Sequence, residues 1–348
     1  MSIDPGTELV SEIPSAFQAE VEGKAKLEPG LGPWRLAVRR LRRNKTALAF
    51  LGLFLVIVAM CLAAPFWSSE IAKISASRNN LTGTVTVDGK KRDIVTPQGI
   101  PIGPTWQSQY FLGADENGRD VMVRLLYGGR NSLVIGFAAA FITVVLSVMF
   151  GVLAGFYRGA TDSVISWLMD VLWSFPVILL GVAIGVAAAI GGLNLWIIKI
   201  ESGSLMIPII IIGAVYVPYM ARPIRGQVLA LREKEFVEAA RSQGAGSLRI
   251  MVSELMPNLA STIVVFLPLI VANAILLESA LSFLGAGVQP PETSWGTMID
   301  DGVGLIATAP HLTIVPGLML VACVLALNIF GDGVRDALDP RAKIRLDG

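Results

Sequence analysis

The chain has 348 residues, of which 53% are hydrophobic and 16% charged, and its formal net charge is +1. A mean hydropathy of +0.65 excludes a pair of ordinary soluble domains, and the small net charge argues against binding to nucleic acid. Two cysteines and one histidine leave no disulfide framework, no cysteine-based or histidine-only metal cluster and no relay of several histidines. The composition therefore predicts an integral membrane protein.

The first 45 residues are expected on the cytoplasmic side of the membrane. Residues 1–33 carry scattered Glu, Pro and Gly without apolar periodicity, which predicts a disordered tail and no secretory signal. Residues 34–45 place apolar side chains on one helical face with arginines beside them. This pattern predicts an amphipathic helix in the membrane interface, although flanking arginines also simply anchor a first membrane span.

Charge-free windows of the length needed to cross about 30 Å of hydrocarbon predict six transmembrane helices. They are Thr46–Ser69, Asn131–Tyr157, Val171–Ile198, Ser202–Ala221, Leu255–Leu277 and Gly302–Gly331. The third is expected to begin earlier, near Ser163. Prolines inside these windows predict a kinked helical bundle.

The windows divide the chain into a first transmembrane helix, a long extracytoplasmic loop, a five-helix core and a C-terminal tail. Their residues are 46–69, 70–130, 131–331 with a cytoplasmic loop at 222–256, and 332–348. Basic residues precede the first window, fill the loop at 222–256 and recur in the tail, with Lys199 as the exception among short segments. This distribution predicts that both termini are cytoplasmic, since charge in the long outer loop has little topological weight.

The outer loop contains one readable pattern, the alternating residues Thr84–Val87 followed by Asp88 and Gly89. A type I′ turn needs positive φ at both central residues, and Asp-Gly satisfies this need. We expect a small external β-hairpin there. Its return arm alternates poorly, so the register is left open, and a passive surface elaboration is the favoured interpretation.

The loop at 222–256 contains a polar, helix-prone segment that must project into water. At 3.6 residues per turn, Phe236, Ala240 and Gly244 fall on one face, apart from the acidic residues. Small residues would let another surface approach that face closely, and Gly244 would end the helix. Taken alone, the segment is equally consistent with a solvated amphipathic helix.

Two ionisable residues, Asp170 and Glu278, lie within or at the edge of predicted spans and are candidates for a translocation path. Alternatively, Asp170 is held by a backbone or arginine partner near the inner surface, and Glu278 is hydrated at the outer end of its helix. No nucleophile–base pair, phosphate-binding loop or metal-ligand spacing is present in the sequence. An aromatic belt is expected from Trp67, Trp106, Trp173, Trp196 and Trp295.

The cytoplasmic segment resembles the coupling loop of ABC-importer permeases. The matching residues are Glu238, Ala239, Ala240, Gly244 and Pro257. Glu254 and Met256 depart from the pattern, because Ile and Leu are usual there. Two further segments resemble the dipeptide and oligopeptide branch of these permeases. They are Gly113–Ser132, with Asp115, Arg119 and Arg124, and Glu278–Gly296, with Ser294 and Trp295.

The resemblance covers about Trp34 to Arg341 and implies an all-α integral membrane protein of the type I importer class, with six transmembrane helices and a cytoplasmic coupling helix. It implies a di- or oligopeptide importer in the plasma membrane of a bacterium or archaeon, in which this chain is not itself an enzyme. The implied ATPase-coupling residues are Phe236, Glu238, Ala239, Ala240, Arg241, Gly244 and Pro257.

The implied partners are a second related permease, two ATPase subunits that hold ATP and Mg, an extracytoplasmic binding protein, the peptide and membrane lipids. This chain itself is expected to bind no cofactor or metal. Import of nickel or another small solute stays open within the family. A secondary transporter coupled to ions through Asp170 and Glu278 is the rival from another class.

Overall fold

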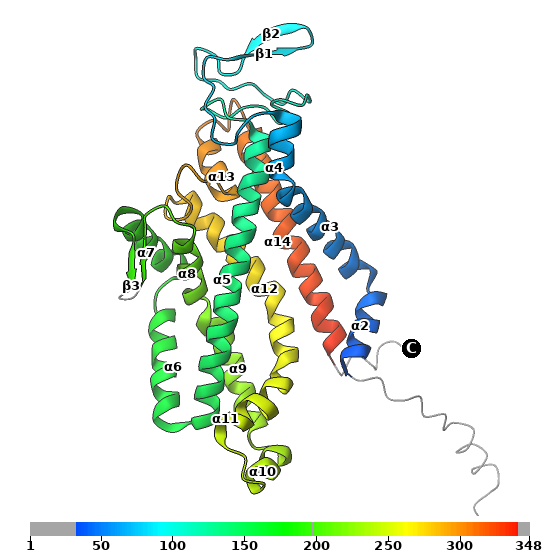
Figure 1. The fold of residues 1–348 in the computed structure, drawn as a ribbon, viewed down its shortest axis with the longest axis vertical. Helices are drawn as coiled ribbons and strands as arrows, with labels where there is room; N and C mark the ends of the chain where they lie inside the picture. Colours follow the sequence, from blue (N-terminus) through cyan, green and yellow to red (C-terminus); the bar gives the residue numbers. More distant parts are fainter. Residues whose placement is uncertain (1–32, 196–197, 340–348) are drawn as a thin grey trace, which may run out of the picture.

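The computed structural model describes residues 33–195 and 198–339 as an elongated helical bundle (Figure 1). The helices are α2 (Pro33–Arg43), α3 (Lys45–Leu62), α4 (Ala64–Phe66), η1 (Trp67–Ala72), α5 (Val121–Tyr157), α6 (Gly159–Trp173), α7 (Val177–Gly191), α8 (Met206–Val215), α9 (Val217–Leu231), α10 (Glu235–Ser242), α11 (Ser247–Arg249), η2 (Ile250–Leu255), α12 (Met256–Phe283), α13 (Trp295–Val303) and α14 (His311–Leu338), with η1 and η2 π-helical. The strands are β1 (Thr84–Val87), β2 (Lys90–Asp93), β3 (Leu193–Leu195) and β4 (Ile198–Ile200). The tail expected at 1–33 lies, except for Pro33, outside the described residues.

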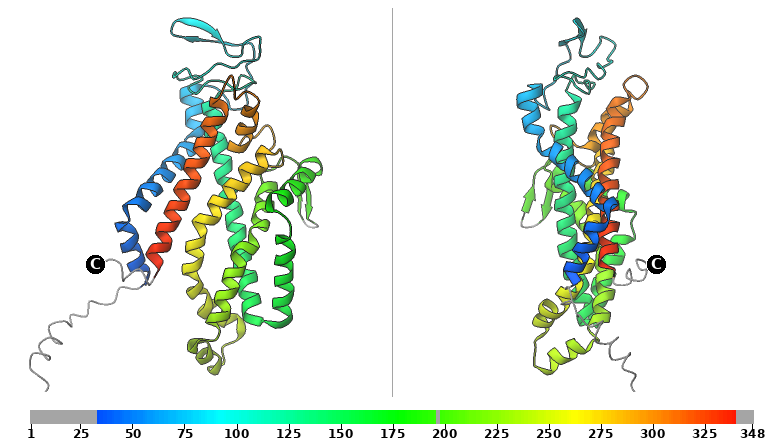
Figure 2. Two further views of the ribbon diagram at one scale, coloured as in Figure 1. Left: turned by 180° about the vertical axis from the view of Figure 1, so that it is seen from behind. Right: turned by 90° about the vertical axis from the view of Figure 1, so that its right-hand side faces the viewer.

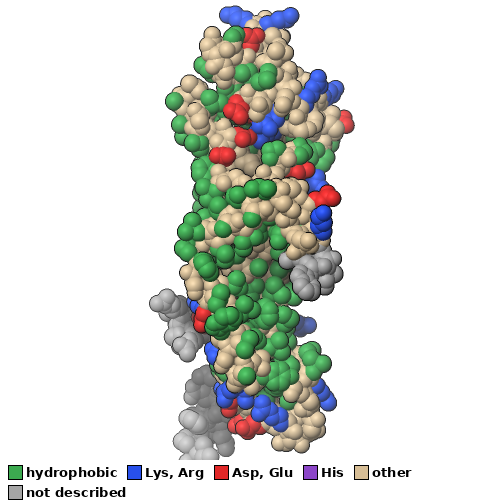
Figure 3. All heavy atoms as spheres, turned by 90° about the vertical axis from the view of Figure 1, so that its left-hand side faces the viewer, with side chains coloured by type: hydrophobic (Ala, Val, Ile, Leu, Met, Phe, Trp, Pro, Cys, Tyr) green, Lys and Arg blue, Asp and Glu red, His purple; other side chains and the backbone are tan. Residues whose placement is uncertain are grey.

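Five helical stretches are long and apolar enough to cross a membrane. They are Lys45–Leu62, Val121–Tyr157, Met206–Leu231, Ser247–Phe283 and His311–Leu338, and the bent pair α6–α7 makes a sixth if it counts as one span. Hydrophobic side chains gather along the middle of the face in Figure 3, whereas charged side chains gather toward its two ends. This arrangement suits a bundle that stands upright in a bilayer.

The third predicted span, Val171–Ile198, differs most from the structure. Helices α6 and α7 meet at 83° across Ser174–Pro176, and α7 ends at Gly191. Pro176 has no N–H to donate and disfavours helical geometry in the residue before it, so the bend falls at this proline. An unexpected second hairpin, β3–β4, follows α7.

Other helix ends also differ from the predicted windows. Helix α5 begins at Val121 instead of Asn131, because Arg124 and Arg130 had interrupted the charge-free window. Helix α14 runs on to Leu338, past Gly331, and α13 precedes it as a separate short helix that ends at Val303.

Helix α5 is the central element of the bundle, in contact with α3, α8, α9 and α12. Its approach to α9 is close at Gly151, where an added Cβ would lie 2.7 Å from the Ile224 Cγ2 and 2.9 Å from the Ala221 carbonyl oxygen. The Ser147 hydroxyl donates to the Val217 carbonyl at 2.9 Å in the same seam. A small residue and an inward hydroxyl therefore fix α9 against α5.

Helices α3 and α14 lie side by side, and Figure 2 shows the same neighbourhood from two further directions. Helix α2 contacts α14, and Arg40 donates to the Asp339 carbonyl at 2.9 Å, just past the carboxyl end of α14. An arginine at the carboxyl end of a helix satisfies carbonyls that lack helical partners. The amphipathic segment is thus tied to the end of the last span.

The β-hairpin predicted at Thr84–Asp93 is confirmed. Strand β1 pairs antiparallel with β2, with Val87 opposite Lys90, and Asp88 and Gly89 have φ of 55° and 74°. The rest of the outer loop has its own small core around Ile94 and Tyr110. The hairpin therefore stands on an ordered base at the outer end of the bundle (Figure 1).

Candidate functional site

The predicted coupling segment forms α10, a short helix at the end of the bundle opposite the hairpin (Figure 1). Val237 anchors it: the side chain is fully buried in the same hydrophobic cluster as Phe156, Ile250 and Leu255. The Arg241 guanidinium lies 5.8 Å from the centre of the Phe156 ring, a cation–π contact. Helix α10 is therefore mounted on the inner ends of α5 and η2.

Phe236, Ala240 and Gly244 were expected together on one face of this helix, but they differ in how far they are buried. Phe236 is 36% exposed, whereas Ala240 is half-buried and packs against the core. Glu238 and Ala239 are exposed, and Glu238 forms no ion pair with any described residue. The outward surface of α10 is thus formed by Phe236, Glu238 and Ala239.

The chain after α10 extends this surface with two apolar residues that the sequence pattern did not indicate. Leu248 is 72% exposed and Val252 is 58% exposed. Pro257, at the start of α12, is also exposed. Helix η2 contacts α10, and we name the exposed apolar residues Phe236, Ala239, Leu248 and Val252 of this region the inner tip. Exposed apolar side chains of this kind mark a contact surface for another protein or for lipid.

Gly244 ends α10 in a Schellman motif. Its φ is +79°, the Ala245 N–H donates to the Ala240 carbonyl at 3.0 Å, and the Gly244 N–H donates to the Arg241 carbonyl at 2.9 Å. This left-handed position favours glycine because it lacks a Cβ. An added Cβ would meet nothing within 4 Å, so the position faces open space.

Asp170 has the arginine partner that was one of its two interpretations. Its Oδ1 accepts from the Arg222 Nη2 at 2.7 Å, and the same guanidinium lies 4.6 Å from the centre of the Trp173 ring. The Asp170 side chain is 68% exposed and that of Arg222 is 40% exposed. The ion pair joins α6 to α9, and both side chains remain accessible on the surface of these helices.

Glu278 is not hydrated at the outer end of α12, because its side chain is completely buried. The Ser282 hydroxyl donates to its Oε1 at 2.7 Å, and the Ser279 hydroxyl donates to its Oε2 at 3.3 Å. The carboxyl group is thus held by two hydroxyl groups of α12 itself, and it is sealed from solvent.

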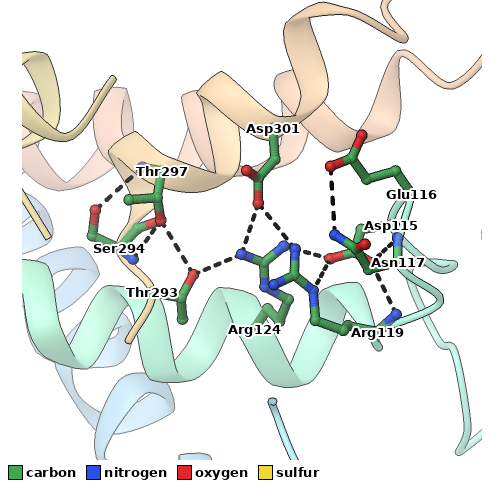
Figure 4. Close-up of polar contacts among 9 residues, drawn as sticks. All are labelled: Asp115, Glu116, Asn117, Arg119, Arg124, Thr293, Ser294, Thr297 and Asp301. Atoms are coloured by element: carbon green, nitrogen blue, oxygen red, sulfur yellow. Dashed lines mark hydrogen bonds and ion pairs between the residues drawn. The ribbon is translucent and has the colours of Figure 1, made fainter. Parts of the chain in front are cut away.

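A second polar cluster holds the outer end of α5, where the conspicuous sequence segments converge (Figure 4). The Arg124 Nη2 donates to Asp301 at 2.9 Å and to the Thr293 hydroxyl at 3.2 Å, and its Nη1 donates to Asp115. Asp115 also accepts from the Arg119 Nε at 2.7 Å. We name these five residues the outer clasp; it links the outer loop, α5 and α13.

Asp120 caps α5 immediately beside the outer clasp. Its Oδ1 accepts from the Val123 N–H at 3.0 Å, and its Oδ2 accepts from the Tyr110 N–H at 2.7 Å. Burial raises the pKa of the Asp120 carboxyl, and these two backbone donors oppose the rise. The capped helix start and the loop core are therefore joined at one carboxylate.

Trp295 does not belong to an aromatic belt. It is fully buried, and its Nε1 donates to the Leu125 carbonyl at 3.1 Å. Ser294 caps α13 in a reciprocal capping box with Thr297. Trp106, in contrast, is exposed on the outer loop, and Trp196 lies outside the described residues.

Two family models match this chain. Residues 147–344 match "binding-protein-dependent transport system inner membrane component", and residues 32–81 match "N-terminal TM domain of oligopeptide transport permease C". The chain also resembles an inward-facing methionine ABC transporter structure with a TM-score of 0.51 and 20% identity, which covers 62% of this chain and 97% of the other. That likeness supports the fold alone.

Curated relatives agree with the family models. The chain is 33% identical over 313 residues to the dipeptide transport system permease of Alkalihalophilus pseudofirmus, covering 90% of this chain and 91% of the relative. It is 34% identical over 312 residues to the oligopeptide transport system permease of Haemophilus influenzae, covering 90% of both. The glutathione transport system permease of Pectobacterium atrosepticum is also 34% identical over 312 residues, with 89% and 92% covered.

The family settles the broad class of activity. The chain is a multi-pass inner-membrane permease subunit of an ABC importer for peptides or related substrates, and a binding protein and ATPase subunits complete the importer. ATP is held and hydrolysed by the ATPase subunits, and the permease binds no cofactor. The protein therefore belongs to the binding-protein-dependent inner-membrane permeases, among the peptide permeases of the dipeptide and oligopeptide type.

Proposed function

We propose that this chain imports di- or oligopeptides, forms half of the translocation pathway with a second related permease, and is driven through α10. The observation that carries the coupling role is the inner tip, an exposed apolar surface rigidly mounted on the spans through Val237. A surface that is apolar outside and anchored inside transmits a push to the helices that hold it.

In this mechanism the helix Glu235–Ser242 docks in a groove of an ATPase subunit. Phe236 and Ala239 supply the apolar contact, and Glu238 stands beside them as a free carboxylate that can pair with a basic group of the ATPase. Ala240 and Arg241 hold the helix to the bundle, Pro257 stands exposed at the start of α12, and Gly244 lets the chain turn away from the docked face. Closure of the ATPases then moves α5 and α12 together.

The substrate assignment rests on the relatives, whose names include dipeptide, oligopeptide and glutathione transport. All three are short peptides with charged ends, so a peptide is the favoured substrate over nickel. Asp170 is proposed as part of the pathway because its exposed ion pair lies within the spans. Glu278 is proposed as a structural pin of the outer end, because it is sealed among serines.

Uptake is expected to depend on ATP and not on an ion gradient. In membrane vesicles that contain the complete transporter, peptide uptake should stop when ATP is withdrawn and persist when a protonophore collapses the proton gradient. The measurement is accumulation of a radiolabelled dipeptide and tripeptide. Uptake that survives ATP withdrawal but ends with the gradient would favour the ion-coupled carrier.

Both termini and α10 are proposed to face the cytoplasm. A Ser242→Cys variant should therefore resist a membrane-impermeant maleimide in intact cells and react after permeabilisation, since the site is exposed on the inner tip side. Lys91→Cys on β2 is the matched outer control and should react in intact cells. The native Cys61 and Cys323 are buried and should contribute little background. Rapid labelling of Ser242→Cys from outside would reverse this topology.

A further inference from the structure

Helix α9 has two chemically different faces. The face toward α5 is fully buried and mainly aliphatic, and includes Val217, Met220, Ile224 and Val228. The other face carries half-buried or exposed residues that are aromatic, polar or charged. They are Tyr219, Arg222, Gly226 and Gln227, with Tyr216 at the junction between α8 and α9.

Helix α12 presents a matching row to this face. Four of its residues recur at helical spacing: Asn258, Thr262, Phe266 and Asn273. The two rows meet along their length in three contacts. The Tyr216 hydroxyl donates to the Asn273 carbonyl at 3.3 Å, the Tyr219 and Phe266 ring centres lie 6.1 Å apart, and the Thr262 hydroxyl donates to the Gln227 Oε1 at 2.5 Å. We name eight residues of these two rows the inner seam: Tyr216, Tyr219, Gly226 and Gln227 on one side, and Asn258, Thr262, Phe266 and Asn273 on the other.

The Asp170–Arg222 pair borders the inner seam on the α6 side. The Trp173 ring centre lies 6.5 Å from that of Tyr219, so the aromatic rings connect α6 to α9 and α12. Arg222 precedes the last residue of α9, Leu231, by about 14 Å at 1.5 Å rise per residue. Arg222 therefore lies inside the stretch Met206–Leu231, which is long and apolar enough to cross a membrane.

The position of Arg222 within a candidate span makes the exposure of the ion pair informative. Charged groups in lipid-exposed positions at mid-bilayer are costly, and those found in spans face protein or water. The exposed surface of α14 is apolar instead, as suits contact with lipid, and it includes Leu318 and Val321. The seam also has room beside it, since a Cβ added at Gly226 would meet nothing within 4 Å.

We propose that the inner seam and the Asp170–Arg222 pair line a water-filled inner half of the translocation pathway and contact the peptide. Amide and hydroxyl groups of the seam suit the peptide main chain, the aromatic rings suit its side chains, and Arg222 and Asp170 suit its carboxylate and ammonium ends. The choice of peptide as occupant rests on the proposed function. The water-filled pathway itself does not depend on which substrate is transported.

Cysteine accessibility tests the pathway without reference to the substrate. In a background with Cys61 and Cys323 replaced by alanine, single cysteines are placed at Gly226 and Thr262 on the seam and at Leu318 as the lipid-facing control. Inside-out vesicles that contain the complete transporter are treated with a positively charged methanethiosulfonate reagent. The seam cysteines should react at least about tenfold faster, because thiolate forms in water and not in lipid. Rates equal to Leu318→Cys would overturn the proposal and indicate lipid or a sealed contact with the second permease.

Peptide contact is tested by the kinetics of transport. Arg222→Gln should raise the KM for peptide uptake about tenfold with little change in the maximal rate, since it removes one charged hydrogen-bonding group. Gly226→Trp should lower uptake at least about tenfold while peptide-stimulated ATP hydrolysis is retained, because it narrows the path without touching α10. Leu318→Trp is the matched control and should transport normally.

The two failures are distinguishable. Normal uptake by both Arg222→Gln and Gly226→Trp would overturn the peptide contact while peptide import still stands. If the unaltered transporter imports no peptide but the seam cysteines still react rapidly, the substrate assignment fails and the pathway assignment stands.

Discussion

A Gly244→Trp variant is expected to lose peptide uptake and peptide-stimulated ATP hydrolysis together, each by more than about tenfold, which corresponds to ~1.4 kcal/mol. Gly244 faces open space beside the docked side of α10, so an indole there would keep the ATPase surface away from the inner tip. The variant should still insert, because the position lies outside all described spans. The measurements are uptake in vesicles, ATP hydrolysis with the binding protein present, and the amount of transporter in the membrane.

Backbone strain must be separated from bulk in this experiment. Any residue other than glycine at φ +79° has a cost of about 1–2 kcal/mol from the left-handed conformation. Gly244→Ala carries that strain with little bulk and should retain most activity. If Gly244→Trp assembles and transports as Gly244→Ala does, α10 is not the coupling contact.

An Arg124→Met variant is expected to destabilise the permease strongly. The Arg124 and Asp115 side chains are only 5% and 4% exposed, and removal of one partner leaves a buried charge with weaker compensation. Breaking such a pair typically costs about 3–5 kcal/mol. The expected result is a fall of roughly 6 °C or more in the midpoint of thermal unfolding in detergent, followed by intrinsic tryptophan fluorescence.

The neighbouring residues provide the controls for Arg124. Arg124→Lys keeps the charge but loses the fork that reaches Asp115, Asp301 and Thr293 at once, so its loss should be intermediate. Arg92→Met on the exposed strand β2 removes an arginine without a buried partner and should leave the midpoint unchanged. Equal midpoints for Arg124→Met and Arg92→Met would show that the outer clasp adds no stability.

Patterns within one segment predicted the fold best. Hydrophobic windows found the spans, and Asp88-Gly89 predicted a turn whose two residues both have positive φ. The window rule failed at the start of α5, because it treats a charge as an interruption regardless of its partner. Arg124 is neutralised by Asp301, which belongs to a helix 177 positions further along the chain.

The candidate site shows the same limit. Periodicity identified α10 and the glycine that ends it, but the inward side was set by the contact of Val237 with distant core residues. Trp295 was expected in an aromatic belt at the span ends, yet the ring is buried against α5 because the chain returns there after α12. Pro176 predicted a kink in this span from the sequence alone. The 83° angle depends on how α6 and α7 pack against the rest of the bundle.

Helix α5 is longer than the bilayer hydrocarbon is thick, so it raises the outer end of the protein above the membrane. Its 37 residues span about 55 Å, against about 30 Å of hydrocarbon, so roughly 25 Å of continuous helix extends beyond the apolar slab. The outer clasp grips this extension from the side, and the hairpin rests above it. A binding protein would therefore contact a surface that stands above the lipid headgroups. One part of α5 thus shapes the surface that receives the substrate, while the other part anchors the chain in the bilayer. Substitutions in one part can therefore alter its role without disturbing the other.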